Sequence, residues 1–131
     1  MSWVHDNEII SYEVNLKNDK IVVHTFYEKD NQTEFTDIIF EGVISHLFEH
    51  PLKGSIILDI QDYNIQLFLK ENKELLAKNK NHGWPLMYND IEELERKLSQ
   101  EHFKYIVIYS SYGLNGWVLA KDYKIDVKAN K

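Results

Sequence analysis

The sequence contains no cysteine. Disulfide bonds, cysteine-ligated zinc sites and thiol nucleophiles are therefore excluded. Proline and glycine are also scarce, with two and five residues in a chain of 131. Because no linker rich in Pro, Gly or Ser and no internal repeat divides the chain, we expect a single domain over residues 1–131.

Arginine is almost absent, since Arg96 is the only arginine among the fifteen basic residues. Few side chains can therefore bind a phosphate group in bidentate fashion. The net charge of −6 also repels nucleic acid phosphates. We therefore expect no nucleic acid partner.

Long hydrophobic runs are missing as well. The segment Met1–Glu8 carries neither a basic start nor an apolar stretch, so it has no signal-peptide pattern. The run Tyr105–Tyr109 is far too short to cross a bilayer. We expect a cytoplasmic protein without a membrane segment.

Acidic residues are concentrated at the start of the chain. The first 50 residues contain ten acidic residues and three lysines, a charge of −7, whereas the remaining 81 carry +1. A field of this sign attracts basic proteins, although an acidic surface that serves only solubility is the alternative. The candidate partner-binding carboxylates are Glu13, Glu28, Glu34, Asp37 and Glu41.

The acidic segment has the pattern of a β-hairpin. Apolar residues alternate with polar ones over residues 10–16, and the side expected to be buried carries Ile10, Tyr12, Val14 and Leu16. A two-residue turn at Asn18-Asp19 would return the chain as a second strand over residues 21–27. In that register Glu13 lies opposite His24, which gives the histidine a carboxylate partner across the strands.

The rest of the chain alternates between strand and helix patterns. The expected strands span residues 33–40, 55–60, 103–109 and 117–120, and a turn at Asn115-Gly116 joins the last two. One expected helix spans residues 62–76 and is capped by Asp62. A second helix is expected to begin with a capping box at residues 89–92. Val107 and Ile108 should lie buried on opposite faces of a central strand. This order predicts an α+β domain with a β-meander, two helices and a C-terminal hairpin, the helices packing on a mainly antiparallel sheet.

Residues 46–50 read His-Leu-Phe-Glu-His, the signature of the inverzincin peptidases. On a helix, His46 and His50 would lie about 6 Å apart and could share a zinc ion. On a strand they would be about 13 Å apart, with Glu49 on the opposite face. The segment continues a β-type run and stops at Pro51 without helical caps, which favours the strand and therefore no metal and no cofactor. A small hydrolase or metal-binding enzyme using His46, Glu49 and His50 remains the alternative.

Two weaker groups of residues could carry chemistry. Asp59 and Asp62 could act as an acid–base pair, but a strand end and a helix cap account for them equally well. Tyr63, Trp84, Tyr88 and the loop Lys78–Asn81 could line a pocket, although aromatic residues beside helix ends usually close a core. Neither group indicates a particular reaction.

Three blocks of sequence are similar to one kind of protein. They span residues 40–48, 54–60 and 105–121, and the last block contains Ser-Ser-Tyr-Gly-Leu-Asn-Gly-Trp-Val. Together they resemble small uncharacterised bacterial α+β proteins, some of which are grouped with immunity proteins of polymorphic toxin systems. The resemblance covers residues 35–121, and its motifs are turns and apolar strands, so no functional residue is carried over. It implies a non-catalytic protein that binds and blocks a toxin. The resemblance does not cover the acidic first hairpin, so the expectation of a basic partner at that hairpin rests on the charge alone. The sequence does not indicate an oligomeric state.

Overall fold

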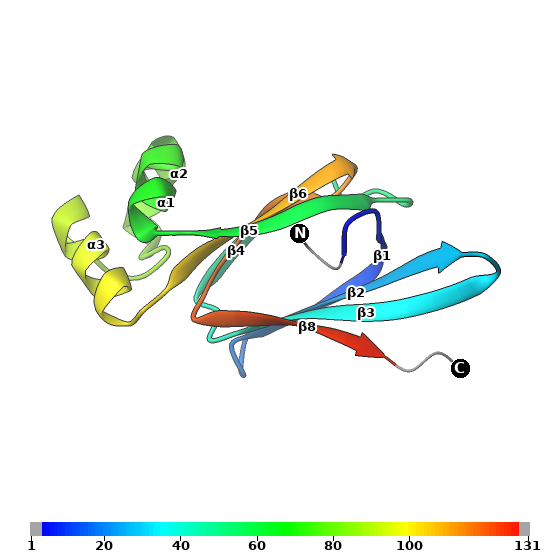
Figure 1. Ribbon diagram of the computed structural model, residues 1–131. Helices are drawn as coiled ribbons and strands as arrows, with labels where there is room; N and C mark the ends of the chain where they lie inside the picture. Colours follow the sequence, from blue (N-terminus) through cyan, green and yellow to red (C-terminus); the bar gives the residue numbers. More distant parts are fainter. Residues whose placement is uncertain (1–3, 129–131) are drawn as a thin grey trace.

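A computed structural model describes residues 4–128 as an antiparallel sheet with helices on one side (Figure 1). The elements are β1 (Glu8–Asn15), β2 (Lys20–Lys29), β3 (Gln32–Glu41), β4 (Ser45–Glu49), β5 (Ile56–Tyr63), α1 (Ile65–Glu71), α2 (Lys73–Asn79), a 3-10 turn (Lys80–His82), α3 (Ile91–Gln100), β6 (Lys104–Tyr112), β7 (Asn115–Ala120) and β8 (Asp122–Lys128). Residues 1–3, which begin the segment Met1–Glu8 considered above for a signal peptide, lie outside this range. Between residues 4 and 128, none of the helices has the length and apolar character needed to cross a membrane.

The strands follow one another in the order β4-β7-β6-β5-β1-β2-β3-β8, and each pair is antiparallel. The α+β class and the antiparallel sheet expected from the sequence are therefore confirmed. Figure 1 shows the sheet folded into two layers, with β4, β5 and β6 in one and β2, β3 and β8 in the other. The layers separate at β1, which pairs with β5 only between Glu8 and Ile56.

Two bent strands connect the layers on the other side. β3 continues into β4 through residues 42–44, and β7 continues into β8 at Lys121. Gly42 has φ +65°, and a Cβ atom there would lie 2.9 Å from the Lys121 Cβ, so the bend requires glycine. The β-type run expected to continue into the His-Leu-Phe-Glu-His segment is therefore interrupted at residues 42–44, although residues 45–49 form a strand as expected.

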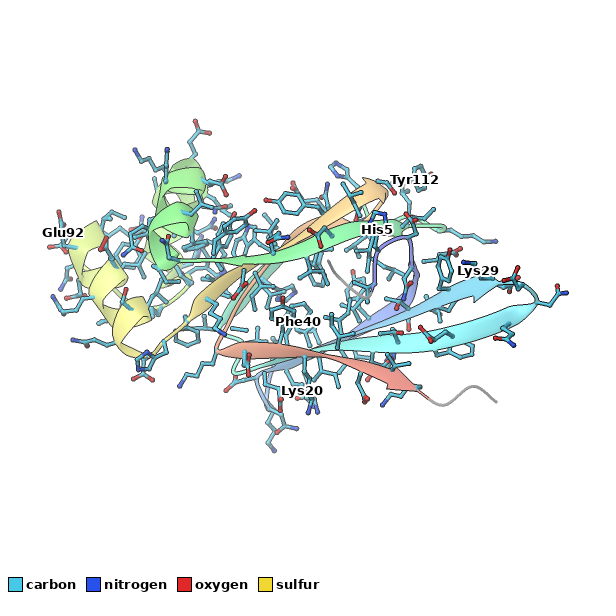
Figure 2. The ribbon with its side chains drawn as sticks, in the orientation of Figure 1. His5, Lys20, Lys29, Phe40, Glu92 and Tyr112 are labelled. Carbon is cyan, nitrogen blue, oxygen red and sulfur yellow. The ribbon has the colours of Figure 1, made fainter. Side chains whose placement is uncertain are left out.

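The first apolar cluster fills the space between the two layers. It includes the fully buried side chains Ile21, Val23, Ile38, Phe40, Ile57, Ile106 and Val118. Figure 2 labels Phe40 between the layers. Burial of this kind provides most of the free energy that stabilises a small domain.

The second apolar cluster lies between the helices and the opposite face of β6 and β7. Its helical members are Ile65, Phe68, Leu69, Leu76, Leu94 and Leu98, and its sheet members are Tyr105, Trp117 and Leu119. Within β6, Val107 therefore faces the helices and Ile108 faces the other layer. The prediction of opposite faces is confirmed, but Val107 is only half-buried.

The helix expected up to residue 76 is interrupted. Asn72 ends α1, and its side-chain amide donates a hydrogen bond to the Phe68 carbonyl at 3.0 Å before α2 begins. The expected cap at Asp62 is wrong, because this residue belongs to β5. Asn64 caps α1 instead, and its side chain accepts from the Leu67 N–H at 3.1 Å.

The expected capping box of α3 lies one residue further along the chain. The Asp90 carboxylate accepts from the Glu93 N–H at 2.8 Å, and the Glu93 carboxylate accepts from the Asn89 N–H at 3.0 Å. The helix start is therefore held from both sides, and Leu94 and Leu98 are buried as expected.

The expected burial of the first strand is wrong. Ile10 is an extra residue in β1, so that Ile9 faces Thr25 and Ser11 faces His24. Residues 10–16 are exposed, with Leu16 at 80%, because β1 leaves β5 after this bulge and the second layer no longer covers it. The turn is also longer than expected, since residues 16–19 all lie between β1 and β2.

The C-terminal hairpin turns earlier than expected, and a strand follows it. Gly113 and Leu114 separate β6 from β7, whereas Asn115 and Gly116 belong to β7. Gly116 instead allows β4 to approach β7 closely, since a Cβ atom at this position would lie 1.9 Å from the Leu47 carbonyl oxygen of β4. β8 was not predicted, and it pairs with β3 over its whole length.

Candidate functional site

Among residues 4–128, no helix packs on one large sheet surface. Figure 1 shows the three α-helices beside the layer that contains β5 and β6, so the outward surface of β1, β2, β3 and β8 is open. We call this surface the outer face. On β2 it carries Val22, His24 and Phe26, because the residues between them point into the core.

Three cross-strand pairs form the centre of the outer face. Val22 lies opposite Ile39, His24 opposite Asp37 and Phe26 opposite Phe35. The ionic pair therefore lies between two apolar pairs. The phenylalanine rings are 6.4 Å apart between centroids, and Phe35 is 40% exposed.

His24 makes hydrogen bonds with two carboxylates. Its Nδ1 lies 2.8 Å from Asp37 Oδ1, and its Nε2 lies 3.0 Å from Glu13 Oε1. Glu13 reaches His24 diagonally, since the residue directly opposite is Ser11 at the bulge. Two hydrogen bonds raise the pKa of His24 above 6.5; the bond with Asp37 has the larger effect and the bond with Glu13 the smaller. The carboxylate partner expected for His24 is confirmed, although the register is not.

This arrangement favours a charged histidine. Both ring nitrogens face acceptors, so the imidazolium form donates two hydrogen bonds and leaves no lone pair free to accept a proton. A general base needs such a lone pair. In its charged form, His24 therefore cannot act as a general base.

β8 brings lysines to the edge of the outer face. Lys128 Nζ lies 2.7 Å from Asp126 Oδ2 and 3.7 Å from Asp37 Oδ2. The pKa of Asp126 is lowered by its hydrogen bond with Lys128, and the pKa of Lys128 is raised by the same contact. Lys124 lies 3.8 Å from Glu41. The alternation of apolar residues over 122–128 was the signal that could have revealed this strand.

The structure distributes the five predicted carboxylates unevenly. Glu13 and Asp37 meet at His24, and Glu28 and Glu41 point outward near opposite ends of the hairpin of β2 and β3. Glu34 lies on the other side of β3, the side that carries the buried Thr36. The outer face therefore combines four of the five.

The His-Leu-Phe-Glu-His segment does not form a metal centre. β4 places the half-buried His46 toward the first cluster, with its ring 5.2 Å from that of Phe48, and this burial lowers its pKa. Glu49 points to the opposite face, and His50 follows the strand with φ +57°. Nowhere in residues 4–128 do three His, Asp or Glu side chains gather as a metal site requires.

The other candidate residues are separated. Asp59 and Asp62 lie three positions apart on β5 and point to opposite faces. Trp84 packs against Trp117 with ring centroids 5.9 Å apart, and the Tyr63 hydroxyl is 2.9 Å from that of Tyr109. Of the three aromatic residues expected at a pocket, Tyr88 lines a groove beside the helices.

The chain matches no protein-family model, and no curated protein or solved structure shows significant similarity to it. Its function is therefore inferred from the chemistry of the outer face.

Proposed function

We propose that the protein is a non-catalytic binding module that recognises a basic protein through its outer face. The observation that carries this proposal is the central set of cross-strand pairs, in which His24 and Asp37 lie between two apolar pairs on an uncovered sheet. Aromatic residues such as Phe26 and Phe35 are enriched at protein–protein interfaces, and here they lie beside the His24–Asp37 pair.

The charges on the outer face support a basic partner. Carboxylates outnumber lysines among its outward-facing residues; the carboxylates are Glu8, Glu13, Glu28, Asp37, Glu41, Asp122 and Asp126, and the lysines are Lys20, Lys124 and Lys128. A negative surface speeds the approach of a positive partner and excludes partners of its own sign. The lysines of β8 weaken this field at one edge without reversing it.

The resemblance to immunity proteins supports an inhibitory role. An immunity protein acts by covering a surface of its toxin, so it needs an exposed binding face and no catalytic group. The outer face meets the first requirement, and the fully bonded His24 is consistent with the second. The partner would then be a toxin domain with a basic surface.

Affinity capture from the native host tests the proposal. The bait proteins are the wild type, the outer-face variant Glu13→Gln/Glu28→Gln/Glu41→Gln, and the control variant Glu49→Gln/Glu74→Gln/Glu92→Gln, whose carboxylates are exposed and lie elsewhere. We expect a basic protein to bind the wild type and the control and to be lost from the outer-face variant. Equal capture by all three would contradict the proposal. For the inhibitory role, the adjacent upstream gene should encode a long protein with a variable C-terminal toxin domain.

A further inference from the structure

A groove lies beside the helices, away from the outer face. It runs between α1 and α2 on one side and the start of α3 on the other, and its volume is 780 Å³. This volume is within the range of about 300–1,000 Å³ typical of small-molecule sites. Figure 2 labels Glu92 in α3, at the end of the molecule opposite Lys29.

The floor of the groove is apolar. Leu69 and Leu76 form its bottom, and Ala77, Tyr88 and Ile91 line its walls. Ile91 shares one face of α3 with Leu94 and Leu98, which are fully buried, yet Ile91 is 46% exposed. The apolar stripe of α3 therefore continues beyond the packed core into the groove.

Lysines lie around this apolar floor. Lys70, Lys73 and Lys80 all line the groove. Among the residues that the structure describes, the Lys80 ammonium donates to the Asn89 carbonyl at 2.7 Å and lies over the Tyr88 ring, whereas the ammonium groups of Lys70 and Lys73 make neither a hydrogen bond nor an ion pair. Two ammonium groups are thus available to an incoming anion.

The two carboxylates that line the groove each accept a hydrogen bond within the protein, and the three lysines outnumber them. Asp90 caps α3 by accepting from the Glu93 N–H, and Glu95 accepts from the Gln66 amide at 3.3 Å. In a chain of net charge −6, this groove therefore presents lysines beside an apolar floor. That combination complements a ligand with an apolar body and one negative charge.

We propose that the groove binds an alkyl carboxylate. The alkyl chain lies on Leu69, Leu76 and Ile91, and the carboxylate reaches the ammonium groups of Lys70 and Lys73. Lysine suits a single carboxylate because its ammonium acts as a compact point charge. This site is independent of the proposed protein-binding role, since it shares no residue with the outer face.

An NMR titration of isotope-labelled full-length protein tests the site. The probes are decanoate, below its micelle concentration, and decyltrimethylammonium, which has the same chain and the opposite charge. We expect decanoate to cause saturable shifts at Leu69, Tyr88 and Ile91, and the cation to cause none there. Shifts that do not saturate, that lie elsewhere, or that are equal for both probes would overturn the proposal.

Two variants and one control separate binding from folding. Lys70→Glu/Lys73→Glu should weaken decanoate binding by about tenfold or more. Ile91→Asp should also weaken it while keeping the fold, since an acidic residue suits the first turn of a helix. Lys17→Glu/Lys53→Glu changes the net charge equally at distant exposed positions and should bind like the wild type. Equal weakening in both double variants, or undiminished binding by Ile91→Asp, would contradict the site.

Discussion

At the scale of single residues, His24 defines the chemistry of the outer face. Its two ring nitrogens face Asp37 and Glu13, and Lys128 lies on the far side of Asp37. The folded state therefore favours the protonated imidazole more than the unfolded chain does. Since this preference links folding to pH, it can be measured.

We predict that the stabilisation provided by His24 decreases as the pH rises. The pKa of His24 is raised on folding, so its contribution is complete below the ordinary value of 6.5 and is lost through the raised folded pKa. The free energy of unfolding of the wild type should exceed that of His24→Asn by more at about pH 5.5 than at about pH 9. Urea denaturation of both proteins at the two pH values measures this difference.

The Asp37→Asn variant provides the control for this prediction. Removing the carboxylate that contributes most to the shift should lower the pKa of His24 in an NMR titration. A pKa of His24 at or below 6.5 in the wild type would contradict the charged cluster.

The hydrogen-bond partners of His24 could be predicted from the sequence only in part. The Glu13 partner followed from strand alternation, but Asp37 was considered only as one of the acidic residues among the first 50. The bulge at Ile10 has no local signal, and it lies where β1 leaves β5, a separation that depends on the whole sheet. The register was wrong because residues 16–19 form a longer turn than the two residues expected, and residues 10–16 are exposed because β1 leaves β5.

At the scale of elements, glycines allow close contact between strands. Gly116 pairs with Phe48 where β7 meets β4, and its missing side chain leaves room for the Leu47 carbonyl. The sequence singled out Gly116 as a turn residue. Its actual role depends on the approach of a strand nearly seventy residues earlier, which no local pattern shows.

We predict that Gly116→Ala destabilises the protein by about 2–4 kcal/mol, because the added Cβ forces β4 away from β7. Gly54→Ala is the matched control: Gly54 also has positive φ, but a Cβ there meets nothing within 4 Å. It should cost only about 1 kcal/mol from backbone strain. Similar losses in chemical denaturation of the two variants would refute the close-approach role.

β6 provides a second prediction at this scale. Ile108→Ala should lower the free energy of unfolding by about 2–4 kcal/mol, since Ile108 is 1% exposed in the cluster between the layers. Val107→Ala should cost roughly half as much, because Val107 is half-buried beneath the helices. A larger loss for Val107→Ala than for Ile108→Ala would invert the assignment of faces.

Elements with strong local signals were predicted best. The N-terminus of α3 was expected one residue from its observed position, because capping depends on a few neighbouring residues. The strand over residues 122–128 was missed although Tyr123, Ile125 and Val127 alternate with polar residues. Its pairing with β3 joins segments more than eighty residues apart, so its role at the sheet edge could not be read locally.

At the scale of the whole molecule, two apolar clusters account for three of the four sheet surfaces. The first cluster uses the inner surfaces of both layers, and the second uses the surface beneath the helices. The fourth surface is the outer face, and no helix or strand of the described residues 4–128 covers it (Figure 1). The sequence predicted an acidic hairpin as the partner surface, but only the fold shows that this hairpin belongs to an open four-stranded layer.

We predict that the charges of the outer face affect binding much more than folding. Glu13→Gln/Glu28→Gln/Glu41→Gln should change the free energy of unfolding by no more than about 1 kcal/mol, because exposed ion pairs contribute little. Thermal and urea denaturation measure this change. A loss of several kcal/mol would mean that these carboxylates stabilise the fold, and the binding results for the variant could not then be assigned to the outer face.

The salt dependence of association with the captured basic partner tests the central claim most directly. Association rate constants are measured at low and high salt for the wild type, the outer-face variant and the control Glu49→Gln/Glu74→Gln/Glu92→Gln. The outer-face variant should associate more slowly at low salt and show a weaker salt dependence, while the control matches the wild type. Identical rates and salt dependence for the outer-face variant and the wild type would contradict recognition through the outer face.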